Sequence, residues 1–495
     1  MSNRSGADRG LMHITAKGAK GAKENGSGIG TLAGQKLVNQ SKHWYSHNSL
    51  TWVFGADGYF FLQMDLRHQE RFHQLVSEHV HSVNAAVNGL SALPSTALAM
   101  ASVKAMSRFL HHEGVTLPAL IEPVQEQIRV ALAQSASPDV LILHDWSWVA
   151  SVTSNSDCLV SGRHNSPGYD LGSALVVDAA DGRPLGPMEL RLRTADCVLT
   201  TRPGNPRVPD GHINELAEVM ADAKRWNLGR RPVHLVDREG DSSQHYLDWS
   251  RAHHRFVVRA DEGRIVTFRG RALTLKDLAR VPDVTYHAVR EADGSPLCVT
   301  TSQGTGRVQV AEVQITLDQP STRRRDGRRI YMPAPHLSVR LVIGRVVDDH
   351  GRPVALWFLI THGIDEVSAA TIARWYAWRW RIESYYKLLK SAGMNIERWE
   401  QTTGEAVAKR LVVASAACLA VWHLQRDPRP EAAILRRYLI RLSGRQMKYK
   451  VESTAPALLA GLEKLLAVDA LLSDVNLDEI LTLARQTLPH LFRSG

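Results

Sequence analysis

The chain contains 495 residues, of which 44% are hydrophobic, and this is enough apolar material for several folded domains, which excludes an intrinsically disordered protein. No apolar stretch reaches the length expected of a membrane span and no secretion signal is recognisable, so we expect a cytoplasmic protein without a membrane partner. The formal net charge of +10 favours a polyanionic partner, although charge alone does not separate DNA from RNA or anionic lipid.

The N-terminal part of the chain divides into two regions. Residues 1–43 contain Ala-Lys-Gly repeats and scattered glycines, a composition that buries too little apolar surface to order itself. We therefore expect a flexible basic tail. Residues 44–134 show mostly helical apolar spacing with cations between, which predicts a helical module. Its cations suit phosphate contacts or a solvated surface better than base readout.

Two apolar runs in the next part of the chain each end in an aspartate. The runs Pro138–Asp145 and Pro232–Asp237 have the length and composition of buried strands. An aspartate at a strand end is often only a turn former or a helix cap. Two of them on neighbouring strands would also place two carboxylates side by side.

The segments around these two runs carry the signals of a mixed fold. Alternating apolar residues flank the turn dipeptide Asp181-Gly182, and helical patterns occur on both sides of the second run. The order over residues 135–260 is then strand, hairpin, helix, strand, helix and strand. This order fits a mixed α/β sheet of the RNase H-like kind, which would bring Asp145 and Asp237 close together.

Residues 261–362 read as a succession of short alternating strands, which predicts a β-rich insertion. Near its end, Trp357 stands in the apolar run Leu356–Thr361, where a core tryptophan is the ordinary interpretation. The run Arg323–Arg329 resembles a basic hairpin tip. It is either a solvated loop or a phosphate contact.

A helix is predicted in the segment 363–425, beginning near Asp365 or Ser368 and ending before Gly393. Four of its residues follow the pattern Y-x2-R-x3-E-x6-K, and steps of 3, 4 and 7 residues return to nearly the same helical angle. The residues on this stripe are Tyr376, Arg379, Glu383 and Lys390. Ordinary ion pairs on the polar side of an amphipathic helix are the alternative interpretation.

Glu383 adds a third carboxylate to Asp145 and Asp237. Carboxylate oxygens are the ligands that Mg²⁺ and Mn²⁺ prefer, and Mg²⁺ usually takes one or two protein carboxylates together with water and substrate phosphate oxygens. If the three side chains converge, they have the right chemistry to hold two such ions.

The residues named so far resemble the bacterial insertion-sequence-four family of DDE transposases, in its Tn-five-like group. The resemblance covers about residues 60–425 and rests on Asp145, on the stretch Asp237–Asp241 and on the Y-R-E-K pattern of Tyr376 to Lys390, which matches at every fixed position. Residues 103–110 are also similar to the segment that joins the family's end-binding domain to its core.

The resemblance implies a transposase that excises and inserts a mobile element. It implies that the helical module binds the terminal inverted repeats of double-stranded DNA, and that two Mg²⁺ or Mn²⁺ ions act in phosphodiester hydrolysis and transesterification. We expect Asp145 to bridge the two ions, with Asp237 and Glu383 each supporting one. The resemblance implies cut-and-paste transposition through a hairpin intermediate. It also implies a bacterial cytoplasmic protein associated with the nucleoid.

The resemblance also implies DNA contacts. Tyr376, Arg379 and Lys390 would hold phosphates that flank the scissile bond. Arg259 matches a basic residue that touches the DNA end. Trp357 corresponds to a tryptophan that stacks on a flipped base, and this role stands beside its interpretation as a core residue.

The C-terminal segment, residues 426–495, has helical patterns and no chemical motif. By resemblance it would help to form a homodimer on paired DNA ends. Helices that simply cover the core fit the sequence equally well.

Two other functions remain open. The chain could be a metal-dependent nuclease without strand transfer, or a catalytically silent DNA-binding inhibitor of transposition. The intact carboxylates at Asp145, Asp237 and Glu383 argue against the inhibitor, and the Y-R-E-K pattern favours transposition over simple cleavage.

Overall fold

The computed structural model describes most of the chain beyond the N-terminal region: residues 13–14, 64–81, 96–160, 166–204, 212–291, 293–301, 304–325, 328–332, 334, 336–390, 393–447, 452–474 and 476–487. The basic tail predicted for residues 1–43 lies outside the described residues except for the strand β1, His13–Ile14. The first part of the predicted helical module, residues 44–63, also lies outside them.

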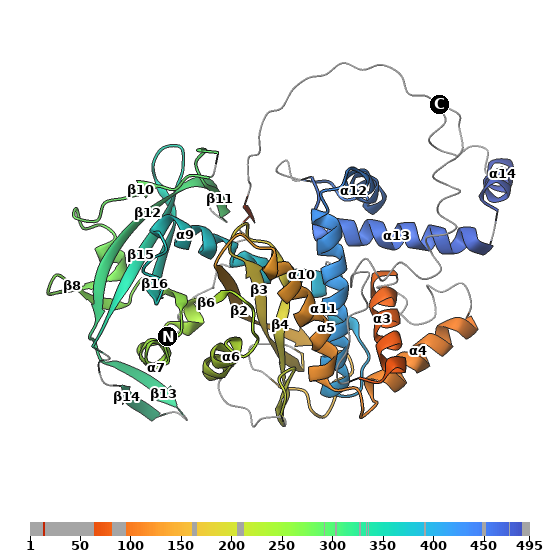
Figure 1. Ribbon diagram of the computed structural model, residues 1–495, viewed down its shortest axis with the longest axis horizontal. Helices are drawn as coiled ribbons and strands as arrows, with labels where there is room; N and C mark the ends of the chain where they lie inside the picture. The colour runs from red at the N-terminus through yellow and green to blue at the C-terminus, as the bar shows by residue number, and fades with distance from the viewer. Residues whose placement is uncertain are drawn as a thin grey trace, which may run out of the picture.

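A mixed sheet of 14 strands runs through the protein, with β13 and β14 forming a separate two-stranded ribbon (Figure 1). The strand order along the main path is β1-β11-β12-β15-β16-β7-β6-β2-β3-β4-β5. The bounds are β2 Asp139–Ala150, β3 Gly168–Asp178, β4 Pro184–Arg193, β5 Val198–Thr200, β6 Arg231–Val236, β7 Phe256–Ala260, β8 Ile265–Phe268, β9 Arg271–Thr274, β10 His287–Ala288, β11 Cys298–Thr301, β12 Gly304–Leu317, β13 Ser321–Arg325, β14 Arg328–Met332, β15 Leu337–Val347 and β16 Pro353–His362.

The α/β class predicted from the sequence is confirmed. The two apolar runs form the parallel neighbours β2 and β6, and β7 continues the parallel part of the sheet. The predicted hairpin is β3 and β4, and Gly182 in its turn has φ +73°, a conformation that glycine adopts readily.

The predicted end of the first strand, at Asp145, is wrong. β2 runs five residues beyond Asp145, to Ala150, because its antiparallel pairing with β3 continues to the end of the strand. Its parallel ladder with β6 stops earlier, at Leu143 opposite Leu235. Asp145 therefore lies in mid-strand, two residues past the last pair of the parallel ladder with β6.

The predicted insertion is rich in strands, as expected, but it does not form a sheet of its own. β16 lies between β15 and β7, so the long strands β12, β15 and β16 extend the same sheet. Figure 1 shows them at the opposite end of the molecule from the helices α11 and α13. The described arginines of the segment Arg323–Arg329 lie in this ribbon, with Arg324 opposite Arg329 and Arg325 opposite Arg328; residues 326–327 lie outside the described residues.

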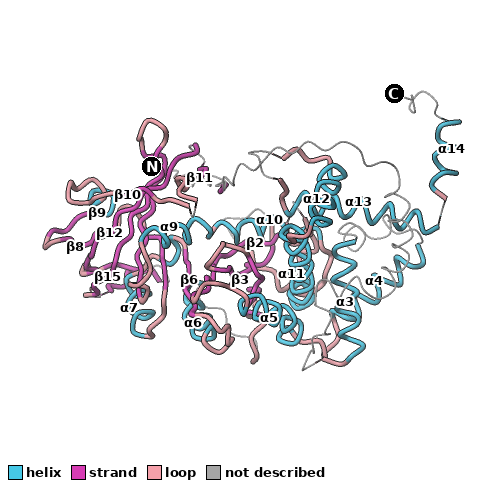
Figure 2. Tube along the Cα trace, turned by 45° about the horizontal axis from the view of Figure 1, so that its top comes forward, coloured by secondary structure: helices cyan, strands magenta, loops and turns pink. Residues whose placement is uncertain are grey.

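Helices cover both faces of the central strands (Figures 1 and 2). α5 and α11 pack against β4, and an ion pair joins Arg191 of the same strand to Glu215, the residue before α6. The α-helices are α3 Leu66–His81, α4 Thr96–Leu110, α5 Leu117–Ala133, α6 Leu216–Ala223, α7 Ser243–Arg251, α8 Leu275–Leu278, α9 Ala369–Trp378, α10 Trp380–Leu389, α11 Gly404–Arg426, α12 Pro430–Ser443, α13 Ala455–Asp474 and α14 Leu477–Thr487; the 3-10 helices are η2 His212–Glu215, η3 Arg238–Gly240 and η4 Ile396–Arg398.

The described part of the N-terminal module is helical, as predicted, and it packs directly on the sheet. Leu120, Val124 and Ile128 of α5 are fully buried in the same core as β4. Gln125 also donates from Nε2 to the carbonyl oxygen of Met188 at 2.9 Å. These contacts make α5 a structural support of the central strands.

Helix α11 has the length and composition of a membrane span, which the sequence analysis did not expect. It is the one such helix in the described part of the chain, and 83% of its apolar window is buried inside the protein. Its N-cap Thr403 accepts a hydrogen bond from Ala406 N, and Val412, Val413 and Ala414 are fully buried. The apolar surface of α11 is thus used to pack the core.

The single helix predicted before Gly393 is two helices that meet at Arg379. Ser368 caps the start of α9, as expected, by accepting from Thr371 N. At the junction Arg379 N donates to the carbonyl of Tyr376, and Ile382 N donates to the carbonyl of Arg379. These i to i+3 bonds tighten one turn, so Arg379 ends α9 and begins α10.

Trp357 is a core residue of β16. Its side chain is 1% exposed, and it lies opposite Gly344 of β15, where an added Cβ would approach Trp357 Cε3 to 2.9 Å. The glycine therefore makes room for the indole. The stacking role expected from the resemblance requires an accessible ring, which this conformation does not provide.

Replacement of Trp357 by alanine should lower the free energy of unfolding by about 3–5 kcal/mol, because it leaves a cavity in a closely packed core. Urea denaturation monitored by far-UV circular dichroism measures the loss. Tyr438→Ala, at a side chain that is 60% exposed on α12, is the matched control and should change stability by less than about 0.5 kcal/mol. Equal stability of Trp357→Ala and the control would contradict the core role.

Candidate active site

The strand register brings two of the predicted carboxylates together. Leu143 of β2 lies opposite Leu235 of β6, and two further steps along each parallel strand reach Asp145 and Asp237. Neighbouring strands are about 4.8 Å apart, so the two aspartates leave adjacent strands at the same level. The sequence prediction that these residues lie close together is supported by this register.

Arg379 joins Asp145 to the third carboxylate. Its Nη2 lies 2.9 Å from Glu383 Oε1, and its Nη1 lies 3.5 Å from Asp145 Oδ2. The side chain of Arg379 is 6% exposed, whereas those of Asp145 and Glu383 are 19% and 30% exposed. The guanidinium thus sits on the protein side of the two carboxylates, which remain accessible to solvent.

The carboxylates affect one another electrostatically. Burial raises the pKa of Asp145 to about 7, and the nearby charges of Asp237 and Glu383 act in the same direction against the cation of Arg379. Burial also raises the pKa of Glu383, to which the charge of Asp237 contributes. Three like charges are therefore held at one place with one buried cation between them.

Hydrogen bonds fix the aspartates. Asp145 Oδ1 accepts from Trp146 N at 2.9 Å, and Asp237 Oδ1 accepts from Glu239 N at 2.8 Å. The second bond caps the 3-10 helix η3, so the helix-cap interpretation of Asp237 is correct for this oxygen. The other oxygen of Asp145, Oδ2, is the atom that lies 3.5 Å from Arg379 Nη1.

Tyr386 supports the site and was missed by the sequence analysis. Its hydroxyl donates to the backbone carbonyl of Asp145 at 2.7 Å and lies 3.3 Å from that of Leu171. The bond ties α10 to β2 at the residue that carries the carboxylate. The signal was present in the sequence, because Tyr386 follows Glu383 by three residues and shares its side of the helix.

Two of the predicted DNA-binding cations lie near the carboxylates. Val236 of β6 pairs with Val258 of β7, so one further step places Arg259 beside Asp237. Lys390 ends α10, where its Nζ donates to the carbonyl of Trp148 and lies 3.2 Å from Glu397 Oε1. Both residues are at the edge of the sheet where Asp145 lies.

Tyr376 does not share the exposed stripe predicted for the four residues of the pattern. It is 1% exposed, and its ring centroid lies 5.7 Å from that of Trp357. Its hydroxyl is buried and has no hydrogen-bond partner among the described residues. Since α9 ends at the junction beside Arg379, Tyr376 faces the core instead of solvent, and the predicted phosphate contact is not available in this conformation.

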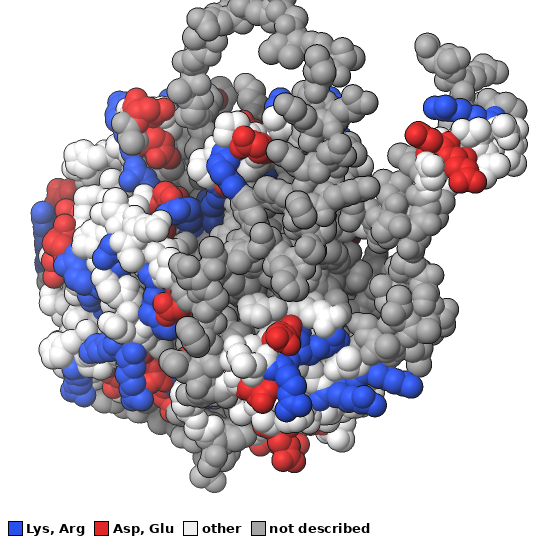
Figure 3. All heavy atoms as spheres, turned by 45° about the vertical axis from the view of Figure 1, so that its right-hand side comes forward, with Lys and Arg blue, Asp and Glu red and all other residues white. Residues whose placement is uncertain are grey.

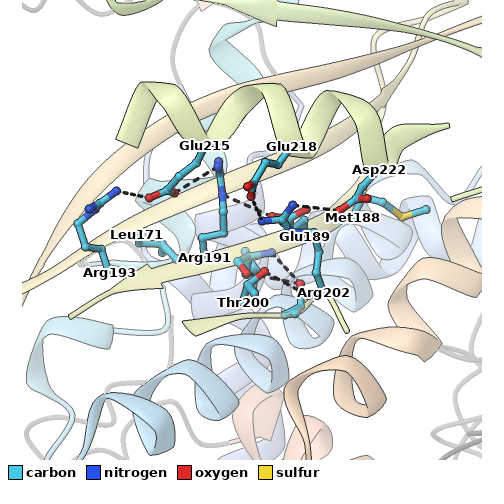
Figure 4. Close-up of polar contacts among 12 residues, drawn as sticks. Leu171, Met188, Glu189, Arg191, Arg193, Thr200, Arg202, Glu215, Glu218 and Asp222 are labelled. Carbon is cyan, nitrogen blue, oxygen red and sulfur yellow. Dashed lines mark hydrogen bonds and ion pairs between the residues drawn. The ribbon is translucent and has the colours of Figure 1, made fainter. Parts of the chain in front are cut away.

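A network of charged side chains lies between β4 and α6 (Figure 4). Arg191 of β4 is 2% exposed and extends across Gly172 of β3, so that its Cζ lies 5.8 Å from the ring centroid of Trp146. The network joins β4 and the segment after β5 to η2 and α6. Its members are Glu189, Arg191, Arg193, Arg202, Glu215, Glu218 and Asp222.

This network holds Arg191 beneath the strand residue that follows Asp145. Glu189 is 1% exposed and lies 3.2 Å from Arg202 Nε and 3.5 Å from Arg191 Nε. A fully buried carboxylate is stable only with such partners. The alternation of charged residues in an apolar strand was visible in the sequence, but their partners on α6 were not.

The fit of the three carboxylates to a metal ion can be judged from these contacts. Within the described residues, no group of three His, Cys, Asp or Glu side chains stands ready to hold an ion. Asp145, Asp237 and Glu383 supply oxygen donors of the kind that Mg²⁺ prefers, and Arg379 holds two of them. The donor chemistry fits a divalent ion, provided that Arg379 yields its place between the carboxylates.

Charged side chains on the molecular surface are mixed. On the face shown in Figure 3, Lys and Arg side chains lie beside Asp and Glu over much of the described surface. The described surface of that face therefore shows no large area of positive charge alone, although the chain has a net charge of +10.

Comparisons with known proteins give no assignment. A scan against protein-family models found no match, and a search of curated proteins found none either. The interpretation of the site therefore rests on its residues and geometry.

Asp145→Asn should stabilise the protein relative to wild type more at about pH 8 than at about pH 5. The pKa of Asp145 in the folded protein, about 7, lies above its unfolded value, so wild-type stability is highest below the unfolded pKa and falls as the pH rises toward 7. Asparagine cannot ionise and avoids this loss. Thermal unfolding in EDTA across this pH range measures the difference, and an offset that does not change with pH would contradict the raised pKa.

Proposed function

We propose that this protein is a DNA transposase of the DDE type, with an RNase H-like core, that cleaves and joins double-stranded DNA. The observation that carries the proposal is the shared guanidinium of Arg379, which brings Glu383 to Asp145 on the strand next to Asp237. A carboxylate on a helix and two on adjacent strands meet at one edge of the sheet. The Y-R-E-K pattern adds support, since three of its four residues lie at or near this edge.

Asp145, Asp237 and Glu383 would hold two Mg²⁺ or Mn²⁺ ions. Such a pair of ions, when bound, activates the attacking oxygen of an in-line displacement at phosphorus and stabilises the leaving oxygen. The protein's own part is to fix the carboxylates, which it does through Tyr386 at the backbone of Asp145 and through the cap bond at Asp237.

Arg379 would change partners during the reaction. In this structure its guanidinium pairs with Asp145 and Glu383, and a guanidinium also binds the oxygens of a phosphodiester. If bound divalent ions neutralise the carboxylates, the guanidinium of Arg379 would be free to bind the phosphate next to the scissile bond. Lys390 and Arg259, at the same edge, would hold neighbouring phosphates.

The partner is proposed to be double-stranded DNA with terminal inverted repeats, bound by a homodimer on paired ends. A nuclease without strand transfer is the second candidate. The burial of Trp357 favours it, because this residue was expected to stack on a flipped base in the hairpin step and its ring is not accessible. A joining assay with pre-cleaved DNA ends distinguishes the two, since a simple nuclease cleaves but does not join.

Glu383→Gln should lower metal-dependent cleavage at least about a thousandfold, because it removes one of three convergent carboxylates. Cleavage is measured on duplex DNA taken from both sides of the protein's own reading frame, with Mg²⁺ and with EDTA. DNA affinity should stay within about threefold of wild type, since the chemistry and not the binding is lost.

Glu262→Gln is the matched control, because Glu262 is 54% exposed and pairs with Lys276 in the insertion. It should cleave at the wild-type rate. The proposed function fails if Glu383→Gln cleaves as fast as this control, or if wild type cleaves equally in EDTA.

Arg379→Gln should bind Mn²⁺ about tenfold more tightly than wild type in the absence of DNA. The variant lacks the buried cation that competes for Asp145 and Glu383, and the remaining charges of the carboxylates attract a divalent ion more strongly. Electron paramagnetic resonance of free Mn²⁺ gives the dissociation constant. Arg374→Gln, which removes a cation paired with Glu291, should bind Mn²⁺ as wild type does. Weaker binding by Arg379→Gln than by this control would show that Arg379 does not compete.

A further inference from the structure

The edge of the sheet opposite the carboxylates is basic. β2, β6 and β7 are parallel, so the starts of all three strands lie at one edge and Asp145 and Asp237 lie toward the other. A cavity of about 660 Å³ opens at the strand starts, between Pro138, Pro232 and the loop after α6. Its described lining contains four cations and no carboxylate: Lys224, Arg230, Arg231 and Arg255. We call this cavity the basic hollow.

Two of these cations are held by acidic residues outside the lining. Asp139 is 4% exposed, and its Oδ1 accepts from Arg231 Nε at 2.9 Å and from Arg255 Nη1 at 2.7 Å. Glu366 Oε1 lies 3.1 Å from Arg231 and 2.7 Å from Arg255. These pairs fix both guanidinium groups and neutralise the equivalent of two charges.

The other two cations have no carboxylate partner within the described residues. Arg230 donates to the backbone carbonyls of Gly229 at 3.0 Å and Ser135 at 2.9 Å, and its Nε is buried without a hydrogen bond there. Among the described residues, Lys224 Nζ donates to the carbonyl oxygen of Ala252 alone, at 3.4 Å. Carbonyl oxygens orient a cation without neutralising it. Four cations against two carboxylates leave an excess of two positive charges at the basic hollow.

We propose that the basic hollow binds phosphate groups of a DNA backbone, as a contact separate from the carboxylate site. Arginine and lysine pair with phosphate oxygens, and Arg231 and Lys224 are exposed at the rim, which suits a polyanion lying across the hollow. The choice of DNA rests on the proposed function, whereas the affinity for phosphate rests on the charges alone.

The position of the basic hollow makes it a second contact on the DNA. β6 has six residues, and six residues of extended strand span about 20 Å, which separates the hollow from Asp237. Phosphates held at the two places therefore belong to different parts of a duplex or to different duplexes. The basic hollow would anchor DNA that is not being cut.

The double variant Lys224→Ala/Arg230→Ala tests this proposal in the full-length protein. Binding to a generic duplex is measured by fluorescence anisotropy in EDTA, over about 50 to 200 mM salt, so that no chemistry is needed. We expect the dependence of log affinity on log salt to become less steep by about 1.8, and the affinity to fall about ten- to a hundredfold at the lower salt. Lys224→Arg/Arg230→Lys keeps both charges and should bind within about threefold of wild type.

The matched control is Arg269→Ala/Arg352→Ala, which also removes two positive charges. Both arginines are exposed, at 65% and 75%, and each is already paired with its own aspartate. The control should keep the wild-type salt dependence. If Lys224→Ala/Arg230→Ala does not fold, Lys224→Gln alone should reduce the slope by about 0.9, because Lys224 is exposed and its loss disturbs no packing.

The proposal is overturned if the double variant has the same salt dependence as the control. A second experiment distinguishes DNA from small phosphates. Inorganic phosphate should raise the melting temperature of wild type by no more than it raises that of the double variant. If it raises that of wild type more while DNA binding is unchanged, the basic hollow is a small-phosphate site instead. Cleavage by wild type is measured separately. If wild type does not cleave DNA but the double variant still shows the weaker salt dependence, only the proposed function is contradicted.

Discussion

The structure of the site depends on one constraint: three carboxylates must be kept together although they repel one another. Arg379 meets this constraint by lying between Asp145 and Glu383 with its charge almost fully buried. A buried cation acts strongly on its neighbours because little water screens it. The position of Arg379 at the junction of α9 and α10 is therefore more than a break in a helix. It directs the guanidinium from the helix toward β2.

The same constraint explains the supports around the strands. Asp145 lies beyond the last backbone pair between β2 and β6, so other contacts must fix its backbone if the carboxylate is to keep its position. Tyr386 holds the carbonyl of Asp145 from one side, and Arg191 lies beneath Trp146 on the other, itself fixed by Glu189 and Glu215. The charged network under α6 is costly to bury, and it stays folded because nearly every charge in it has an opposite partner. Its effect is a rigid strand at the point where the carboxylate projects.

The sequence predicted which helices and strands form better than it predicted where they begin and end. Continuous apolar runs predicted β2 and β6, and apolar segments on both sides of Asp181-Gly182 predicted the hairpin of β3 and β4, because local pattern and burial agree there. The end of β2 could not be predicted, since it depends on pairing with β3, which is a long-range contact. In the same way, the pattern of Tyr376 to Lys390 predicted a helical stripe but not its division at Arg379. Tyr376 and Trp357 were assigned to DNA by resemblance, whereas packing of one ring against the other decides where they lie.

Asp145 and Asp237 lie toward one end of the parallel strands and the cations of the basic hollow lie at the other, and two buried histidines lie between them. His144 of β2 and His234 of β6 lie side by side, with Nε2 and Nδ1 2.9 Å apart, and burial lowers the pKa of both. A charged imidazole at this place would repel Lys224, whose charge also lowers the pKa of His234, and would attract Asp145 from the other side. Because both rings stay neutral, neither of them adds charge to the basic hollow or to the carboxylate site. The proposed phosphate contact and the proposed divalent-ion site therefore do not depend on a charged histidine between them.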